Sequence, residues 1–338
     1  MGSERTVKGP RRYVMDRMTL VALLCMLLFG TSFWGLVIVL ERIPPVTLGL
    51  LRAFLVSAFM ISLFYIMGRF KGRKWMMRGR NLLTAGLGGK RGFATAISLA
   101  IFSTVLPNIF QNVGMTMMDP GSTSSLTALI QGVSPVFTII LAVIILNERL
   151  GIWKMTGLLV AIPATAVLTT YGSEGIDLDS RETLGAFLNL LTALSYSVSG
   201  LILKHAMNRG AKPIHLVSVN AMYATLILFP IALFTWMMGW EEPTLILGSG
   251  IHVWLALFYV SVGLYGITAF IWYGVIRSGE LSRVTFFVFL LPVFSYLMGF
   301  VLLGERLDAI QLLAGGILLL GVGISQMGRK KVIICEPD

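Results

Sequence analysis

Residues 135–150 read PVFTIILAVIILNERL, and residues 292–307 read PVFSYLMGFVLLGERL. Both stretches begin with Pro-Val-Phe and end with Glu-Arg-Leu, and an apolar segment of the same length separates the two motifs. A match of this kind indicates an internal duplication. The chain is therefore predicted to consist of two related halves, each with its own copy of this segment.

The composition excludes a soluble globular protein, because 56% of the 338 residues are hydrophobic and only 13% are charged. Apolar runs near twenty residues recur along the chain, and a helix of about that length crosses a hydrocarbon core of about 30 Å. We therefore predict an all-α integral membrane protein with ten transmembrane helices. The predicted spans are 18–40, 46–68, 93–117, 122–146, 152–171, 184–204, 214–238, 251–276, 281–303 and 309–327.

Lysine and arginine residues gather in every second connection between the predicted spans, most densely in 69–91. The alternate connections contain only Arg42, Arg181 and Arg306. This positive-inside bias predicts that both termini are cytoplasmic and that the chain is a multi-pass protein of the cell (plasma) membrane. We interpret 69–91 as a topology anchor against anionic lipid of the bilayer rather than as a nucleic-acid site.

Five spans in each half place corresponding segments on opposite sides of the membrane, so the repeats are predicted to be inverted. Inverted repeats are typical of secondary transporters. The expected organisation is a cytoplasmic segment 1–17, a first repeat 18–171, an extracytoplasmic linker 172–183, a second repeat 184–327 and a cytoplasmic tail 328–338.

Further short motifs occur in a fixed order along the spans. Phe33-Trp34-Gly35 lies in the first span, Arg52-Ala53-Phe54 in the second, and Gly315-Gly316 follows the second copy of the repeated segment. With the two copies, this set resembles the drug/metabolite transporter superfamily, in its EamA family with two EamA repeats, over about residues 18–327. The chain departs from that family at Tyr196, where tryptophan is frequent, and in the register of Gly157 against Gly315.

The resemblance implies a transporter with a central cavity, working as a monomer or homodimer on a small-molecule substrate. The family's cargoes include amino acids, sugars, nucleotide derivatives, purines and drugs. Trp34 matches the family's position for a cavity aromatic in the first span.

Polar side chains inside spans point to the cavity, because they are costly unless they face protein or water. In the fourth span, polar residues recur at steps of three or four and share one helix face. We expect a substrate cavity lined by Trp34, Asn108, Asn112, Gln131, Ser134, Tyr196, Trp272 and Tyr273. The alternative is structural: hydroxyls bond back to their own helix, and aromatic rings pack or lie at the membrane interface.

Arg52 is the one charge well inside a predicted span. We favour a structural or gating ion pair, with Glu41 as a candidate partner, because the resemblance implies an arginine there across unrelated substrates. Snorkelling to water and binding of an anionic substrate group are the alternatives. Pro135 and Pro292 interrupt spans at repeat-related positions, and paired breaks of this kind indicate a hinge or a binding site. A static kink is the alternative.

No Asp or Glu lies in the middle of a predicted span, and His205, His215 and His252 lie at span ends. Coupling to protons or sodium through a buried carboxylate is therefore disfavoured. The sequence lacks a Walker motif, a metal-ligand spacing and a nucleophile–base pair, so we expect no cofactor and no enzyme. Cys25 and Cys335 are not expected to form a disulfide.

These observations predict a permease that exports or exchanges a small organic metabolite by alternating access. A cavity of amides and aromatic rings suits a neutral, zwitterionic or partly apolar substrate, for example an amino acid. The competing interpretation is a non-transporting or lipid-handling helix bundle. A channel has little support, because the spans lack charged rings.

Overall fold

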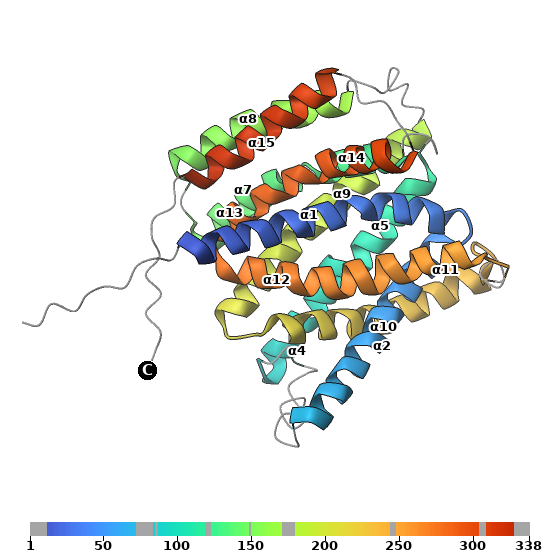
Figure 1. Cartoon of the computed structure of the whole chain (residues 1–338). Helices are drawn as coiled ribbons and strands as arrows, with labels where there is room; N and C mark the ends of the chain where they lie inside the picture. The colour runs from blue at the N-terminus through green and yellow to red at the C-terminus, as the bar shows by residue number, and fades with distance from the viewer. Residues whose placement is uncertain are drawn as a thin grey trace, which may run out of the picture.

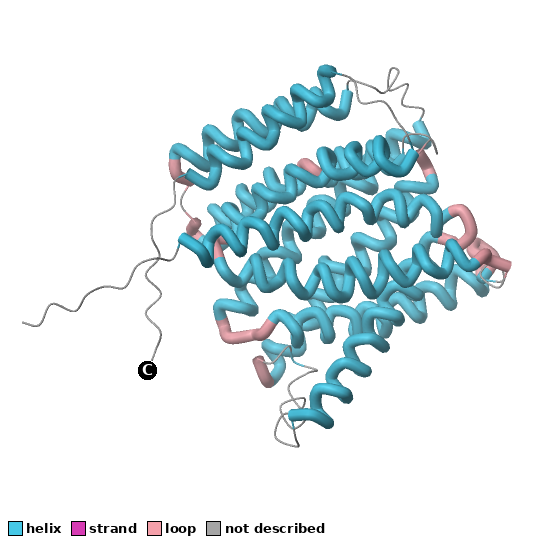
Figure 2. Tube along the Cα trace, in the orientation of Figure 1, coloured by secondary structure: helices cyan, strands magenta, loops and turns pink. Residues whose placement is uncertain are grey.

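The computed structural model is nearly all helical, with loops at the two ends of the helix bundle (Figure 2). It describes residues 12–71, 84, 87–118, 123–148, 150–170, 180–243, 248–303 and 309–327. Most of the predicted tails 1–17 and 328–338 and of the linker 172–183 lies outside the described residues. Cys335 and the second Glu-Arg-Leu, at 305–307, also lie outside them.

Within the described residues, the first half contains eight helical segments, most of which Figure 1 labels. They are α1 Arg12–Leu40, α2 Pro45–Lys71, α4 Gly89–Ala100, the π-helical η2 Ile101–Val105, α5 Leu106–Thr116, α6 Thr123–Gln131, α7 Ser134–Leu146 and α8 Ile152–Thr170. The second half has the same order of spans, but its fourth span is divided into three segments instead of two. It contains α9 Ser180–Asn208, α10 Pro213–Met237, α11 Ile251–Phe258, the π-helical η4 Tyr259–Thr268, α12 Ala269–Ser278, α13 Leu281–Thr285, the 3₁₀-helical η5 Phe286–Leu290, α14 Leu291–Leu303 and α15 Ala309–Met327.

Seven helical stretches within the described residues are long and apolar enough to cross a membrane. They are Met18–Leu40, Pro45–Ile66, Gly89–Thr116, Arg181–Asn208, Pro213–Met237, Ile251–Ser278 and Leu281–Met298. The other three predicted spans contain shorter apolar helices, Ser134–Leu146, Ile152–Ala164 and Leu313–Ser325. Large apolar side chains such as Leu20, Leu159 and Leu226 are exposed on the outside of the bundle, as expected for a surface that meets lipid.

The two halves contact each other through helices of the same rank. The second helices, α2 and α10, pack together, and so do the last helices, α8 and α15, which run side by side along one side of the bundle (Figure 1). The cross-contacts are also reciprocal, because α1 packs on α14 while α9 packs on α7. Each half therefore completes its buried surface with the other half.

The same spans are irregular in both halves. The third span of each half contains a π-helical segment, η2 or η4. The fourth span of the first half is broken at Gly132 and Val133, just before Pro135, and its counterpart passes through η5 just before Pro292. Proline lacks the backbone N–H that would continue a preceding helix, so it is found in the first turn of the next one.

The contact between α8 and α15 depends on small residues. A Cβ atom at Gly157 would lie 2.7 Å from Cβ of Ser325 and 2.8 Å from the carbonyl oxygen of Gly321. We expect Gly157→Leu to force the helices apart and to destabilise the protein by about 1–3 kcal/mol, the usual cost of overpacking. Thermal unfolding in detergent measures this loss.

Gly323→Leu is the matched control for that prediction, because a Cβ atom at Gly323, on the partner helix α15, meets nothing within 4 Å. Equal melting temperatures for the two variants would contradict the close contact.

Candidate functional site

A cavity of about 170 Å³ lies at the centre of the bundle. Its walls come from α1, η2, α6, α7, α9, α10, η4, α12, α13, η5 and α14, so both halves contribute. Its described lining contains hydroxyls, amides, aromatic rings and aliphatic side chains, and no charged residue. Five of the eight predicted cavity residues line it: Gln131, Ser134, Tyr196, Trp272 and Tyr273.

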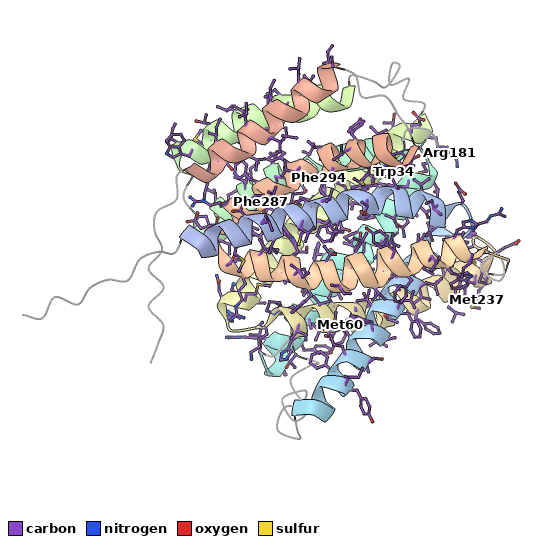
Figure 3. The ribbon with its side chains drawn as sticks, in the orientation of Figure 1. Trp34, Met60, Arg181, Met237, Phe287 and Phe294 are labelled. Carbon is purple, nitrogen blue, oxygen red and sulfur yellow. The ribbon has the colours of Figure 1, made fainter. Side chains whose placement is uncertain are left out.

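The other three predicted residues lie outside this lining. Trp34 donates its indole N–H to the carbonyl of Ser295 on α14 (3.1 Å), and Figure 3 labels it close to Phe294 of that helix. Asn108 donates to the carbonyl of Thr104 (2.7 Å), and Asn112 donates to the carbonyl of Pro45 on α2 (2.9 Å). Trp34 therefore joins α1 to α14, and the two asparagines lie where α5 packs against α2.

Hydroxyl pairs join helices around the cavity. The hydroxyls of Tyr196 on α9 and Tyr265 on η4 lie 3.1 Å apart, and that of Tyr273 lies 3.2 Å from Oγ of Ser103 on η2. Asn220 on α10 donates to the same Ser103 (3.4 Å) and its oxygen accepts from Thr104 (3.0 Å). The π-helical segments thus supply polar groups to the wall, and π-bulges occur frequently at functional sites.

The helix break in the fourth span places polar groups beside the cavity. Gln131 ends α6, is only 5% exposed, and has a side-chain nitrogen with no hydrogen-bond partner. The carbonyl of Ser134 accepts from the hydroxyls of Thr138 (3.0 Å) and Ser197 (2.9 Å). A discontinuous membrane helix next to a cavity is the kind of site that binds cargo in transporters.

Arg52 is 2% exposed, and its guanidinium carbon lies 3.9 Å from the centroid of the Tyr265 ring. None of its three side-chain nitrogens has a hydrogen-bond partner. The ion pair suggested by the sequence is not formed with Glu41, which is exposed. A cation–π contact is worth about 0.5–2 kcal/mol, whereas burying an ion costs several kcal/mol. The Tyr265 contact therefore does not offset the cost of burying Arg52.

A carboxylate joins α7 to α13 at one end of the bundle, called here the Glu148 end. Glu148 accepts hydrogen bonds from the backbone N–H of Leu281 (2.8 Å), the backbone N–H of Ser282 (3.0 Å) and the Ser282 hydroxyl. It thereby caps α13, whose first N–H groups have no partner within the helix. Asn147, with φ 53°, ends α7 in the left-handed region and turns the chain so that Glu148 points to α13.

Basic residues extend this network. Lys154 on α8 is 4% exposed and donates to the Ser282 hydroxyl (2.7 Å) and to Glu280 (2.8 Å). Lys204 on α9 donates to the carbonyl of Ile276 (3.1 Å). The α12–α13 turn is therefore tied to helices of both halves.

The same kind of cap joins two helices at the opposite end of the bundle, called here the Glu241 end. Glu241, which follows α10, accepts from the backbone N–H groups of Val46 (2.7 Å) and Thr47 (2.9 Å) and from the Thr47 hydroxyl (2.7 Å). It caps α2 with the pattern that Glu148 uses on α13. Trp236 of α10 also donates to the Thr47 hydroxyl (2.8 Å). A hollow of about 500 Å³ lies beside this contact, lined in part by Pro45, Val113 and Glu242.

Sequence reasoning missed both capping carboxylates. Glu148 was visible only as part of a repeated motif, and Glu241 only as an acid in a connection. The motif Glu-Arg-Leu after a helix was the one available signal, and it did not name the partner of Glu148.

Through Glu280, the stability of the contacts at the Glu148 end depends on pH. Burial raises the pKa of its carboxyl, but Lys154, Arg283 and Lys204 outweigh burial and hold the pKa below its ordinary value of 4.5. A lowered pKa stabilises the fold above pH 4.5, and this contribution is lost as the pH falls through the lowered folded-state value. The effect is small, because the Glu280 side chain is 53% exposed.

We therefore expect Glu280→Gln to remove part of the drop in melting temperature between pH 6 and acid pH. Glu242→Gln, a change of an exposed carboxylate at the opposite end, is the control. A pH profile of Glu280→Gln identical to that of the wild type would contradict the role of the Lys154–Glu280 pair.

Relatives of the chain agree with this architecture. The EamA-like transporter family model matches residues 17–170 and 183–326, which confirms the resemblance seen in the sequence. A solved crystal structure with a TM-score of 0.70 and 17% identity covers 92% of this chain and 96% of its own, so it shares the fold.

Two relatives match nearly over their whole length. An "uncharacterized transporter" of Archaeoglobus fulgidus is 25% identical over 306 residues, covering 87% of this chain and 94% of its own. A "probable amino-acid metabolite efflux pump" of Escherichia coli is 27% identical over 319 residues, covering 92% and 95%. With both repeats matched and several membrane-spanning helices present, the chain is a multi-pass membrane protein that belongs to the EamA-like transporter family.

Proposed function

We propose that the chain is a secondary transporter that exports or exchanges a small organic metabolite by alternating access. The observation that carries this proposal is a neutral central cavity beside repeat-related helix breaks, with a carboxylate at each end of the bundle that caps a helix of the other half. A transporter needs one closure for each side of the membrane, and Glu148 and Glu241 supply one each.

The proposed arrangement is ten transmembrane helices in two inverted five-helix repeats, in the plasma membrane, with cytoplasmic termini. The pairing of α2 with α10 and of α8 with α15 supports a two-fold relation between the halves. The lysine and arginine bias of the connections supports the orientation, with the Glu148 end in the cytoplasm.

Cargo of modest size and no large net charge suits the cavity. Its volume of about 170 Å³ is below the range of about 300–1,000 Å³ that is typical for drug-sized ligands. Tyr196, Trp272 and Tyr273 offer aromatic surface, while Gln131 and Ser134 offer neutral polar groups. The name of the E. coli relative makes an amino-acid metabolite the first class of cargo to test.

Movement between the two closed ends requires a place where helices bend. We place it at the breaks before Pro135 and Pro292, where the helical hydrogen bonding is already interrupted. An exchange rate unchanged in both Pro135→Ala and Pro292→Ala would remove this hinge from the proposal.

Counterflow in proteoliposomes tests the function. Vesicles preloaded with unlabelled leucine, phenylalanine, a sugar, a nucleoside or a purine receive the labelled compound outside. A transporter accumulates label transiently in vesicles loaded with its cargo, and protein-free vesicles do not. Absence of exchange for every compound, with scrambling of a labelled phospholipid instead, would favour the lipid-handling bundle.

A further inference from the structure

The buried guanidinium of Arg52 has unused hydrogen-bonding capacity. Arginine remains charged at any physiological pH and carries five N–H donors in a planar fork. At 2% exposure none of its nitrogens has a hydrogen-bond partner, and within the described part of the chain no carboxylate lies at salt-bridge distance from it. The geometry that satisfies such a fork is a carboxylate held by two parallel hydrogen bonds.

Unused acceptors lie on the neighbouring helix α5. The side-chain oxygens of Asn108, Gln111 and Asn112 are buried and have no hydrogen-bond partner. The side-chain amide nitrogens of Asn108 and Asn112 each donate to a backbone carbonyl. The side-chain oxygens of both asparagines therefore still have their accepting capacity. Asn112 bonds to Pro45 of α2, and Cβ of Asn108 lies 3.1 Å from the Cβ position of Gly49 on α2. The side chains of Asn108 and Asn112 therefore lie along the α2–α5 boundary, on the helix next to that of Arg52.

This polar region lies between the central cavity and the hollow at the Glu241 end. Tyr265, whose ring makes the cation–π contact with Arg52, lines the central cavity. Pro45, whose carbonyl accepts from Asn112, lines the hollow at the Glu241 end. A cargo that leaves the central cavity towards the Glu241 end would pass the Tyr196–Tyr265 pair and meet these groups.

We propose that Arg52 binds a carboxylate of the cargo and that the free amide oxygens of α5 accept hydrogen bonds from an ammonium group beside it. The site then recognises a zwitterionic head group, and this inference rests on the proposed transport function. A purely anionic cargo would leave the oxygens of Asn108, Gln111 and Asn112 unpaired. A cationic amine without a carboxylate would be repelled by Arg52.

Ligand pairs that differ only in the carboxylate test this site. The melting temperature of the purified protein in detergent is measured against L-leucine and L-leucinamide, and against L-phenylalanine and L-phenylalaninamide. We expect the wild type to bind the acid of at least one pair about tenfold or more tightly than its amide, because charge-assisted bidentate bonds are lost with the amide. Equal binding within both pairs, or no response to either acid, overturns the proposal.

Variants assign the preference to Arg52. Arg52→Gln should abolish the preference for the acid, and Arg52→Lys should retain part of it, since lysine keeps the charge but not the fork. Arg42→Gln removes an exposed arginine at the end of α1 and should leave the preference unchanged. Size-exclusion profiles and unliganded melting temperatures show which variants are folded. A folded Arg52→Gln protein that keeps the preference overturns the assignment.

Counterflow separates this inference from the proposed function. If the protein binds the acids more tightly than the amides but exchanges no compound, the Arg52 site is supported and the transport function is contradicted. If acids and amides are exchanged at equal rates, the transport function is supported and the Arg52 carboxylate site is contradicted.

Discussion

Gly200→Trp will reduce counterflow to the level of protein-free vesicles while leaving the protein folded. Gly200 lines the central cavity, and a Cβ atom there would meet only the side chain of Leu281, at 3.6 Å. That is an ordinary van der Waals contact, so the backbone does not need to move. The indole ring then occupies the space of about 170 Å³ that the proposal assigns to cargo. The measurement is exchange of labelled cargo in proteoliposomes with equal amounts of protein.

Gly316→Trp is the control for Gly200→Trp. Gly316 lies exposed on α15, and a Cβ atom there meets nothing within 4 Å. Its exchange should equal that of the wild type. Persistent exchange by a folded Gly200→Trp protein would mean that cargo does not pass through this cavity.

Glu148→Ala will destabilise the protein by roughly 3–5 kcal/mol, the loss typical when one partner of a buried charged network is removed. The N–H groups of Leu281 and Ser282 lose their acceptor, and a hydrogen bond to a charged group contributes about 1.5–3 kcal/mol. Lys154 retains Glu280 but loses the Glu148 carboxylate 3.9 Å away. Opening of the Glu148 end should also raise the reactivity of a cysteine placed in the cavity towards reagents from that side.

Glu41→Ala, which removes an exposed carboxylate, provides the comparison for Glu148→Ala. Its melting temperature should stay within the error of the wild-type value. A Glu148→Ala protein as stable as Glu41→Ala would contradict a closing role for the carboxylate.

The repeat and the helical class were predictable from the sequence because they depend on local patterns. Apolar runs indicate membrane-spanning helices, and a motif repeated in register indicates a duplication. The prolines at 135 and 292 correctly marked where two spans are interrupted. The π-helical segments at 101–105 and 259–268 were not predicted, since their composition differs little from that of an apolar α-helix.

The site was only partly predictable, because polar periodicity does not tell which neighbour a polar face meets. Gln131 and Tyr196 line the cavity, whereas the side-chain amide of Asn112 donates a hydrogen bond to Pro45 of α2. The capping carboxylates bind residues that are far away in the sequence. Glu148 and Leu281 are 133 residues apart, and Glu241 and Thr47 are 194 residues apart. Contacts over such separations leave no local pattern, and only the fold shows them.

Alternating access requires the cavity to open in turn to both sides of the membrane. The most direct measurement is labelling of Gln131→Cys with a membrane-impermeant maleimide, in a background where Cys25 and Cys335 are alanine. Right-side-out and inside-out vesicles present opposite faces to the reagent. Alternating access predicts labelling from both faces, with cargo slowing each reaction. Labelling from neither face, or from one face only regardless of cargo, would contradict it.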